Sequence, residues 1–199
     1  YQLNGGEFAG EVETSYVSGI GLDKLPEPVR SNYIFLGWYL NGEKVESISS
    51  TQIGTLTLVA KWESVNYDIT YELNGGSFYD GAKIPDNYAE GEGLAELPVA
   101  RRDSYIFDGW MLNGELIDAI DPAHVGDVTL SAKWTPVVYT ISYQLNGGEL
   151  LEEVTEKYTV EDLVNLPAIQ KVGYTFNGWL LNGNKVENIK VGTSGNLVF

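Results

Sequence analysis

Three aspartates, Asp118, Asp121 and Asp127, are the side chains whose type and spacing come closest to a metal site. Hard cations such as Ca²⁺ prefer oxygen ligands, and carboxylates supply them. The same positions in the two neighbouring repeats, described below, hold mixed residue types, and the spacing matches no recognised ligand loop. We therefore expect no metal site, and the three aspartates stay weak candidates for one.

Groups that could carry out catalysis are scarce in this chain. It has no cysteine, and its one histidine, His124, falls in a loop. A catalytic site places a nucleophile or an acid–base group beside partners that shift its pKa. The acidic pairs Glu11/Glu13 and Glu152/Glu153 fall in stretches of variable length, and we interpret them as solvated surface. We expect no enzymatic activity, no catalytic residue and no cofactor.

The chain is acidic, with 28 acidic and 12 basic side chains and a formal net charge of −16. This charge repels phosphate backbones, because nucleic-acid binding depends on a positive patch. It also disfavours anionic lipid surfaces, and no apolar run approaches the length of a membrane-spanning helix. We expect neither a nucleic-acid partner nor direct membrane contact for this segment.

The sequence repeats itself three times. Each copy opens with Tyr-x-Leu-Asn-Gly-Gly and carries Tyr-x-Phe-x-Gly-Trp in its middle, and the first two copies close with Ala-Lys-Trp. A fixed period of this kind indicates an array of similar structural units. We predict three modules, over residues 1–62, 67–134 and 139–199. The pattern begins partway at Tyr1 and stops at Phe199 before a third Ala-Lys-Trp, so we expect a fragment whose first and last strands are truncated.

Alternation and turn signals predict the elements of one module. Apolar and polar residues alternate in the opening segment, as in a strand with one buried face. Asn-Gly follows the Tyr-x-Phe-x-Gly-Trp segment in every copy and is the strongest short signal of a hairpin. Leucines three residues apart precede a proline at 19–26, 91–98 and 160–167, which predicts a short helix, and Thr159 with Asp162 resembles a capping box. We predict an α+β fold, mostly β with one short helix in each module.

Large aromatic residues should form the core of each module. A unit of about 65 residues buries a modest share of its surface, so bulky rings must supply much of the apolar area. The rings recur at strand positions with apolar neighbours. The predicted structural core is Tyr33, Phe35, Trp38, Trp62, Tyr105, Phe107, Trp110, Trp134, Tyr174, Phe176 and Trp179.

Two tyrosines are candidate contact residues, because flat aromatic rings can stack on sugars. Tyr39 and Tyr79 have no tyrosine at the corresponding positions of the other copies; Met111 and Leu180 stand in place of Tyr39. A role of Tyr39 in binding would therefore not be shared by the three repeats.

The three motifs resemble those of the Listeria–Bacteroides repeat, or internalin B-repeat, family, and the resemblance covers nearly the whole chain. It implies a small β-grasp-like (ubiquitin-like) module that occurs in arrays in large, often wall-anchored, surface proteins of bacteria. It implies no catalytic residues. The fold expected from the resemblance is thus three tandem β-grasp-like modules in an elongated array.

Two functions are open on this basis. The first is a semi-rigid spacer or stalk in an extracellular bacterial cell-surface or cell-wall protein, with a role in adhesion. Short connections at 63–66 and 135–138, the second stiffened by Pro136, favour it. The second is a multivalent array that binds host glycans or proteins. We expect a monomer whose partners would be a host or bacterial surface protein or a glycan.

Overall fold

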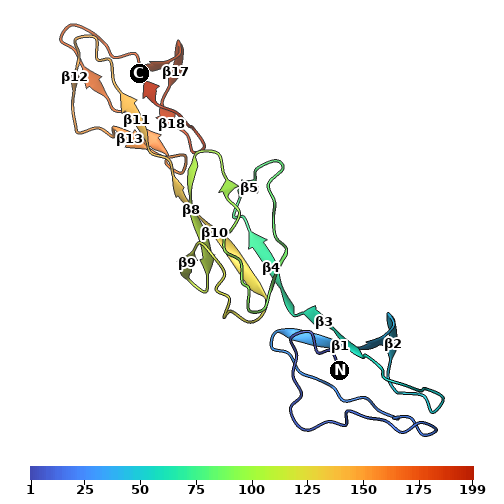
Figure 1. Cartoon of the computed structure of the whole chain (residues 1–199). Coiled ribbons are helices and arrows are strands. Elements are labelled where there is room, and N and C mark those ends of the chain that lie inside the picture. Colours follow the sequence, from blue (N-terminus) through green and yellow to red (C-terminus); the bar gives the residue numbers. More distant parts are fainter. The chain divides into compact units, whose positions relative to one another are not determined.

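The computed structural model covers residues 1–199 and consists of β-strands and connecting loops (Figure 1). No helix forms in the chain. The predicted α+β fold, with a β-grasp-like helix on each sheet, is therefore wrong, and the chain is all-β. None of its segments forms a helix that could cross a membrane.

The residues group into two compact units. Unit 1 contains Tyr1–Thr70, Ile84–Leu97 and Asp118–Thr129, and unit 2 contains Tyr71–Lys83, Pro98–Ile117 and Leu130–Phe199. The first repeat thus lies in unit 1 and the third in unit 2, whereas the middle repeat contributes to both. The three module boundaries inferred from the periodicity stay a prediction.

Unit 1 contains the strands β1 (Tyr33–Leu40), β2 (Glu43–Val45), β3 (Val59–Ser64) and β6 (Asn87–Ala89). Two strands, β4 (Asn66–Glu72) and β10 (Val128–Pro136), have residues in both units. The remaining strands lie in unit 2 and are β5 (Ser77–Phe78), β7 (Ala100–Arg101), β8 (Tyr105–Leu112), β9 (Glu115–Ile117), β11 (Tyr139–Ser142), β12 (Glu149–Leu150), β13 (Lys157–Tyr158), β14 (Val164–Asn165), β15 (Ile169–Gln170), β16 (Trp179–Leu181), β17 (Asn184–Val186), β18 (Asn188–Ile189) and β19 (Leu197–Val198).

The first repeat is organised around β1, which pairs with β2 on one side and β3 on the other, both antiparallel. Asn41 and Gly42 join β1 to β2 with φ angles of 51° and 90°. Both turn positions are therefore left-handed, which confirms the hairpin predicted from Asn-Gly. A bulge between Phe35 and Gly37 shifts the register of β1 against β3. It sets Trp38 opposite Ala60, with Phe35 opposite the closing tryptophan of the repeat.

Unit 2 repeats this hairpin in β8 and β9, and β8 also pairs with β10, so that Trp110 lies opposite Ala132. In the third repeat the hairpin consists of β16 and β17, and β16 begins only at Trp179. The five residues before it, 174–178, belong to no strand. The third repeat also contains β11, which pairs antiparallel with β13 and parallel with β19.

The leucine-rich segments predicted to be short helices are extended and hydrogen-bonded to distant residues. Leu22 and Ile48 exchange backbone hydrogen bonds of 2.9 and 2.8 Å, and Leu94 and Ile120 do the same. In the third repeat the equivalent segment is β14, which pairs with β18. Gly21, at a φ of 82°, shows why a helix cannot continue there, since a right-handed helix needs negative φ.

The contacts expected of a capping box do form, but they close a turn. The Thr159 backbone N–H donates to Asp162 Oδ2 at 2.7 Å, and the Thr159 hydroxyl donates to the same oxygen at 2.8 Å. These bonds hold the pKa of Asp162 below its ordinary value. Serine, threonine and aspartate side chains stabilise turns as readily as helix starts, so the pattern alone does not distinguish the two.

Candidate functional site

A cluster of aromatic rings fills the core of each repeat. In unit 1 the ring of Trp38 lies 4.8 Å from Tyr1 and 5.4 Å from Phe35, centroid to centroid. In unit 2 the ring of Trp110 lies 5.0 Å from Tyr71 and 5.4 Å from Phe107. Most of these pairs are tilted or edge-to-face, the arrangements that aromatic quadrupoles favour. These aromatic rings therefore pack against one another in the core.

The motif tryptophan is anchored identically in all three repeats. Its indole Nε1 donates to a proline carbonyl twelve residues earlier: Trp38 to Pro26 at 2.7 Å, Trp110 to Pro98 at 2.6 Å and Trp179 to Pro167 at 2.6 Å. These tryptophans are 2%, 1% and 4% exposed. The Leu-Pro motif thus supplies the acceptor that a buried indole N–H needs.

The closing tryptophan is held by the opening Asn-Gly-Gly motif. In unit 1 Trp62 Nε1 donates to the Leu3 carbonyl at 2.8 Å, and Asn4 Nδ2 donates to the Ala60 carbonyl at 2.9 Å. A Cβ on Gly6 would overlap the ring of Trp62. Glycine is therefore required there by the close approach of the ring.

Unit 2 contains the same arrangement in the middle repeat. Trp134 Nε1 donates to the Leu73 carbonyl at 2.9 Å, and Asn74 Nδ2 donates to the Ala132 carbonyl at 2.9 Å. A Cβ on Gly76 would overlap the ring of Trp134. The opening Asn-Gly-Gly motif therefore holds the closing strand in place through these two hydrogen bonds.

The first tyrosine of each middle motif lies outside the aromatic cluster. Its ring is covered by a cationic side chain, with Arg30 3.5 Å above Tyr33 and Arg102 3.6 Å above Tyr105. Both tyrosines are half-buried. The Tyr105 hydroxyl donates to Glu161 at 2.8 Å, and this bond raises the pKa of Tyr105.

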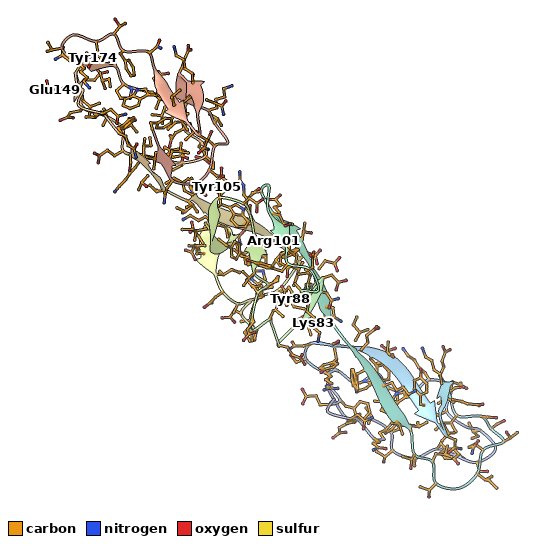
Figure 2. All side chains as sticks on the ribbon, turned by 90° about the horizontal axis from the view of Figure 1, so that it is seen from above. Lys83, Tyr88, Arg101, Tyr105, Glu149 and Tyr174 are labelled. Carbon is orange, nitrogen blue, oxygen red and sulfur yellow. The ribbon has the colours of Figure 1, made fainter.

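In the third repeat two of the predicted core rings are exposed. Tyr174 is 72% exposed and Phe176 is 39% exposed, whereas Trp179 is buried. They border a groove of about 440 Å³. Tyr174, labelled in Figure 2, belongs to the segment that is unpaired in this repeat.

The two candidate contact residues have different surroundings. Tyr39 is half-buried in β1, with the ammonium of Lys61 3.8 Å from its ring centre. Tyr79 is 51% exposed in the loop after β5, and the guanidinium of Arg101 lies 5.3 Å from its ring. Tyr79 therefore offers the larger free ring surface of the two.

Two of the three aspartates considered for calcium accept hydrogen bonds from the backbone. Asp127 Oδ1 accepts the Asp68 N–H at 2.9 Å, and Asp121 Oδ1 accepts the Ala123 N–H at 2.7 Å. No cluster of three histidine, aspartate or glutamate side chains is placed to hold a metal ion, and Asp118 takes part in none. The two bonded aspartates are accounted for by these turn and strand contacts.

A hollow of about 270 Å³ in unit 1 lies beside Tyr1 and Tyr16. Glu13 is the one carboxylate that lines it, and no histidine or basic side chain joins it there. Burial, together with Glu13, raises the pKa of Tyr1. His124 lies elsewhere, with its ring 6.2 Å from that of Tyr88.

Comparison with known proteins places these observations in a family. The sequence matches the Listeria-Bacteroides repeat domain over residues 1–61, 67–133 and 139–199. It is 33% identical over 187 residues to a protein of Evansella cellulosilytica named "Putative Gly-rich membrane protein", covering 90% of this chain and 21% of that protein. No solved structure matches the chain significantly.

Two further relatives have related names. A second Evansella cellulosilytica protein, named "Putative membrane protein", is 31% identical over 186 residues, covering 90% of this chain and 27% of that protein. Internalin H of Listeria monocytogenes is 31% identical over 104 residues, covering 50% of this chain and 18% of that protein. The chain thus spans about a fifth to a quarter of the length of these relatives. Since the family match covers nearly the whole sequence, the chain belongs to the Listeria–Bacteroides repeat family, of which it contains three tandem copies.

Proposed function

We propose that this chain is a non-catalytic, semi-rigid spacer in an extracellular bacterial surface protein, where it separates an adhesive domain from the cell envelope. The observation that carries the proposal is the construction of the joints between repeats. A spacer that transmits position must resist bending where one repeat meets the next. The joints are built from short connections with bonded backbones.

The first joint lies within unit 1 and is a single residue long. β3 ends at Ser64 and β4 begins at Asn66, so Val65 alone separates the two strands. The Val65 N–H donates to the Asn32 carbonyl at 3.1 Å, and the Val65 carbonyl accepts the Glu90 N–H at 2.8 Å. The linking residue is therefore held from both repeats.

The second joint lies within unit 2 and uses the equivalent bond. The Val137 N–H donates to the Ser104 carbonyl at 2.9 Å. Ser104 and Asn32 occupy the same place in their repeats, and each has a φ of 65°. The Tyr105 hydroxyl adds a side-chain bond to Glu161 of the following repeat. The second joint thus repeats one of the two backbone bonds of the first, and two residues, Val137 and Val138, separate its strands.

The location part of the proposal is supported by the relatives. Two of them carry membrane protein in their names and one is an internalin. The acidic composition agrees with a soluble, solvent-exposed segment. The resemblance stated above adds that such repeats occur in wall-anchored proteins.

Small-angle scattering tests the spacer. We expect the profile of an extended particle, with a maximum dimension that changes little with temperature below unfolding. Inserting Gly-Ser-Gly-Ser after Val65 should broaden the distance distribution, since such linkers behave as random coil. The same insertion after Gly10, an exposed loop residue, is the matched control and should leave the distribution unchanged. A compact particle would contradict the proposal.

A second candidate function is a multivalent array that binds a glycan or a surface protein. The exposed ring of Tyr79, beside Arg101 and Asp80, is the observation that favours it. Saturable binding on glycan or host-protein arrays that is lost in Tyr79→Ala but retained in Leu116→Ala would support it. Leu116 is 49% exposed and serves as a control for general surface stickiness.

A further inference from the structure

In the first and third repeats the opening and closing segments lie side by side and run in the same direction. In the first repeat Gln2 pairs with Val59 in a parallel bridge. In the third repeat β11 pairs in parallel with β19, and Ile141 lies opposite Leu197. A parallel pair needs a long crossover connection. The rest of each repeat therefore lies between the two paired segments in the sequence.

Backbone hydrogen bonds join the opening segment directly to the closing segment. In the first repeat the Gln2 N–H donates to the Leu58 carbonyl at 2.8 Å, and the Gln2 carbonyl accepts the Ala60 N–H at 2.9 Å. The third repeat has the equivalent of the first bond, from the Gln144 N–H to the Phe199 carbonyl at 2.6 Å. The two segments of a repeat are thus bonded along their length, as neighbours in a sheet.

Two side chains add cross-links between the same segments of the first repeat. The Trp62 indole N–H donates to the Leu3 carbonyl at 2.8 Å, and the Asn4 amide donates to the Ala60 carbonyl at 2.9 Å. The middle repeat contains the same two side-chain bonds. The opening and closing segments of the first repeat are therefore joined by four hydrogen bonds, two from the backbone and two from side chains.

The direction of the paired segments decides how these bonds respond to tension along the chain. The closing strand β3 continues into β4 of the next repeat through Val65 alone, so tension leaves the first repeat at the end of its closing segment. It enters at the start of the opening segment. Because the two segments are parallel, the two loaded ends lie at opposite ends of the pair. Tension therefore slides one segment along the other and loads all four bonds together. In an antiparallel hairpin such as β1–β2, tension on the two open ends breaks the bonds one after another.

We propose that the repeats bear tensile load, and that the paired opening and closing segments of a repeat form a clamp that tension must shear. The asparagine of the opening motif and the tryptophan of the closing motif are the cross-links of this clamp. Load bearing goes beyond the spacer role, because resistance to bending depends on the joints between repeats, whereas resistance to tension depends on bonds inside each repeat. Forced unfolding is governed by the unfolding rate, so the bonds that lie across the pulling direction set the strength of a repeat.

Single-molecule force measurements on the whole 199-residue chain test the clamp in its first repeat. The chain has no cysteine, so a pair of introduced cysteines defines the pulling direction. One cysteine is added before Tyr1. The second is Asn66→Cys, beyond the clamp, for the shear direction, or Thr57→Cys, at the start of the closing segment, for the unzipping direction, and both positions are exposed. At the same constant force we expect the repeat to stay folded at least about tenfold longer in the shear direction, because two or more hydrogen bonds must break together there.

Two tryptophan-to-phenylalanine variants form a matched pair that tests the cross-link. Trp62→Phe removes the indole N–H that joins the two segments, whereas Trp38→Phe removes the indole N–H that donates to Pro26, away from the clamp. In the shear direction Trp62→Phe should shorten the folded lifetime about two- to tenfold, the rate equivalent of one hydrogen bond. Trp38→Phe also leaves a carbonyl without its donor and should lower equilibrium stability, yet it should change the shear lifetime by less than about twofold.

A second variant covers the case in which Trp62→Phe does not fold. Asn4→Asp removes the other side-chain bond and keeps a residue type that tolerates the positive φ of this position, and it should shorten the shear lifetime in the same way. Equal lifetimes in the two pulling directions, or an effect of Trp38→Phe as large as that of Trp62→Phe, would overturn the proposal. The spacer proposal stands or fails separately, because scattering reports the shape of the unloaded chain and not the strength of its repeats.

Discussion

The indole Nε1 of Trp110 donates a 2.6 Å hydrogen bond to the carbonyl oxygen of Pro98. Trp110 is 1% exposed, and the bond recurs at the same spacing in the other two repeats. The proline ends the leucine-rich segment, so this bond ties that segment to the strand that carries the tryptophan. Ring packing and one directed bond are thus combined in a single side chain.

Truncating this side chain should unfold its repeat. Trp110→Ala removes a buried ring, and we expect a loss of about 3–5 kcal/mol in the free energy of unfolding. Trp110→Phe keeps a ring but leaves the Pro98 carbonyl without its donor, at a cost of about 1–3 kcal/mol. Urea unfolding followed by circular dichroism measures both. Ile106→Ala, at a position 56% exposed, should stay within about 0.5 kcal/mol and is the control.

Two glycine substitutions should reveal the steric effect of the Trp134 ring, because neither glycine has a positive φ. Gly76→Ala places a Cβ into the ring of Trp134, and overpacking of this kind costs about 1–3 kcal/mol. Gly10→Ala meets no atom within 4 Å and should be close to neutral. If the two variants melt alike, the closing tryptophan does not pack against this glycine in solution.

The hairpins, the repeats and the buried motif tryptophans could be predicted from sequence, because each depends on local pattern. Asn41-Gly42 fixes a turn by its own backbone preferences. The leucine-rich segments could not, since their partners are distant: Leu22 bonds to Ile48, and a spacing of three suits a helix or an irregular loop. Tertiary hydrogen bonds decided between the two, together with Gly21 at positive φ.

The site was predicted less completely. Tyr33 and Tyr105 recur like core residues, yet each lies under an arginine, because Arg30 and Arg102 precede them by three residues across a tight turn. Phe176 recurs like a core residue too, yet it is 39% exposed in a segment that belongs to no strand.

Loss of the hydroxyl should change the stability of the protein differently at two tyrosines of the middle repeat. Tyr88 donates to the Gly126 carbonyl at 2.5 Å, so Tyr88→Phe should cost about 0.5–1.5 kcal/mol. The buried Tyr71 hydroxyl has no hydrogen-bond partner, so Tyr71→Phe should be neutral or stabilising. Thermal unfolding of the two variants decides this. A destabilised Tyr71→Phe would indicate a partner for that hydroxyl in solution.

The same hydroxyl should make the protein sensitive to alkaline pH. Burial raises the pKa of Tyr71 from 10.0 to about 12. The unfolded chain therefore releases this proton first, so the contribution to stability is fully present below pH 10.0 and is lost as pH rises toward about 12. Stability curves measured across this range should fall less steeply for Tyr71→Phe than for the wild-type protein. If stability falls equally steeply with pH in the two proteins, the Tyr71 hydroxyl is exposed to solvent.

Asp127 should act through an acceptor oxygen and not through its charge. Its Oδ1 accepts the Asp68 N–H at 2.9 Å, and in the third repeat Asn196 Oδ1 accepts the Thr140 N–H at 3.0 Å in the same way. Asp127→Asn should therefore preserve stability, while Asp127→Ala should cost about 0.5–1.5 kcal/mol. Millimolar Ca²⁺ should shift the unfolding temperature of neither the wild-type protein nor Asp127→Asn. A calcium-dependent rise seen only with the aspartate would show that the carboxylate binds the ion, and the strand-holding role would then be secondary.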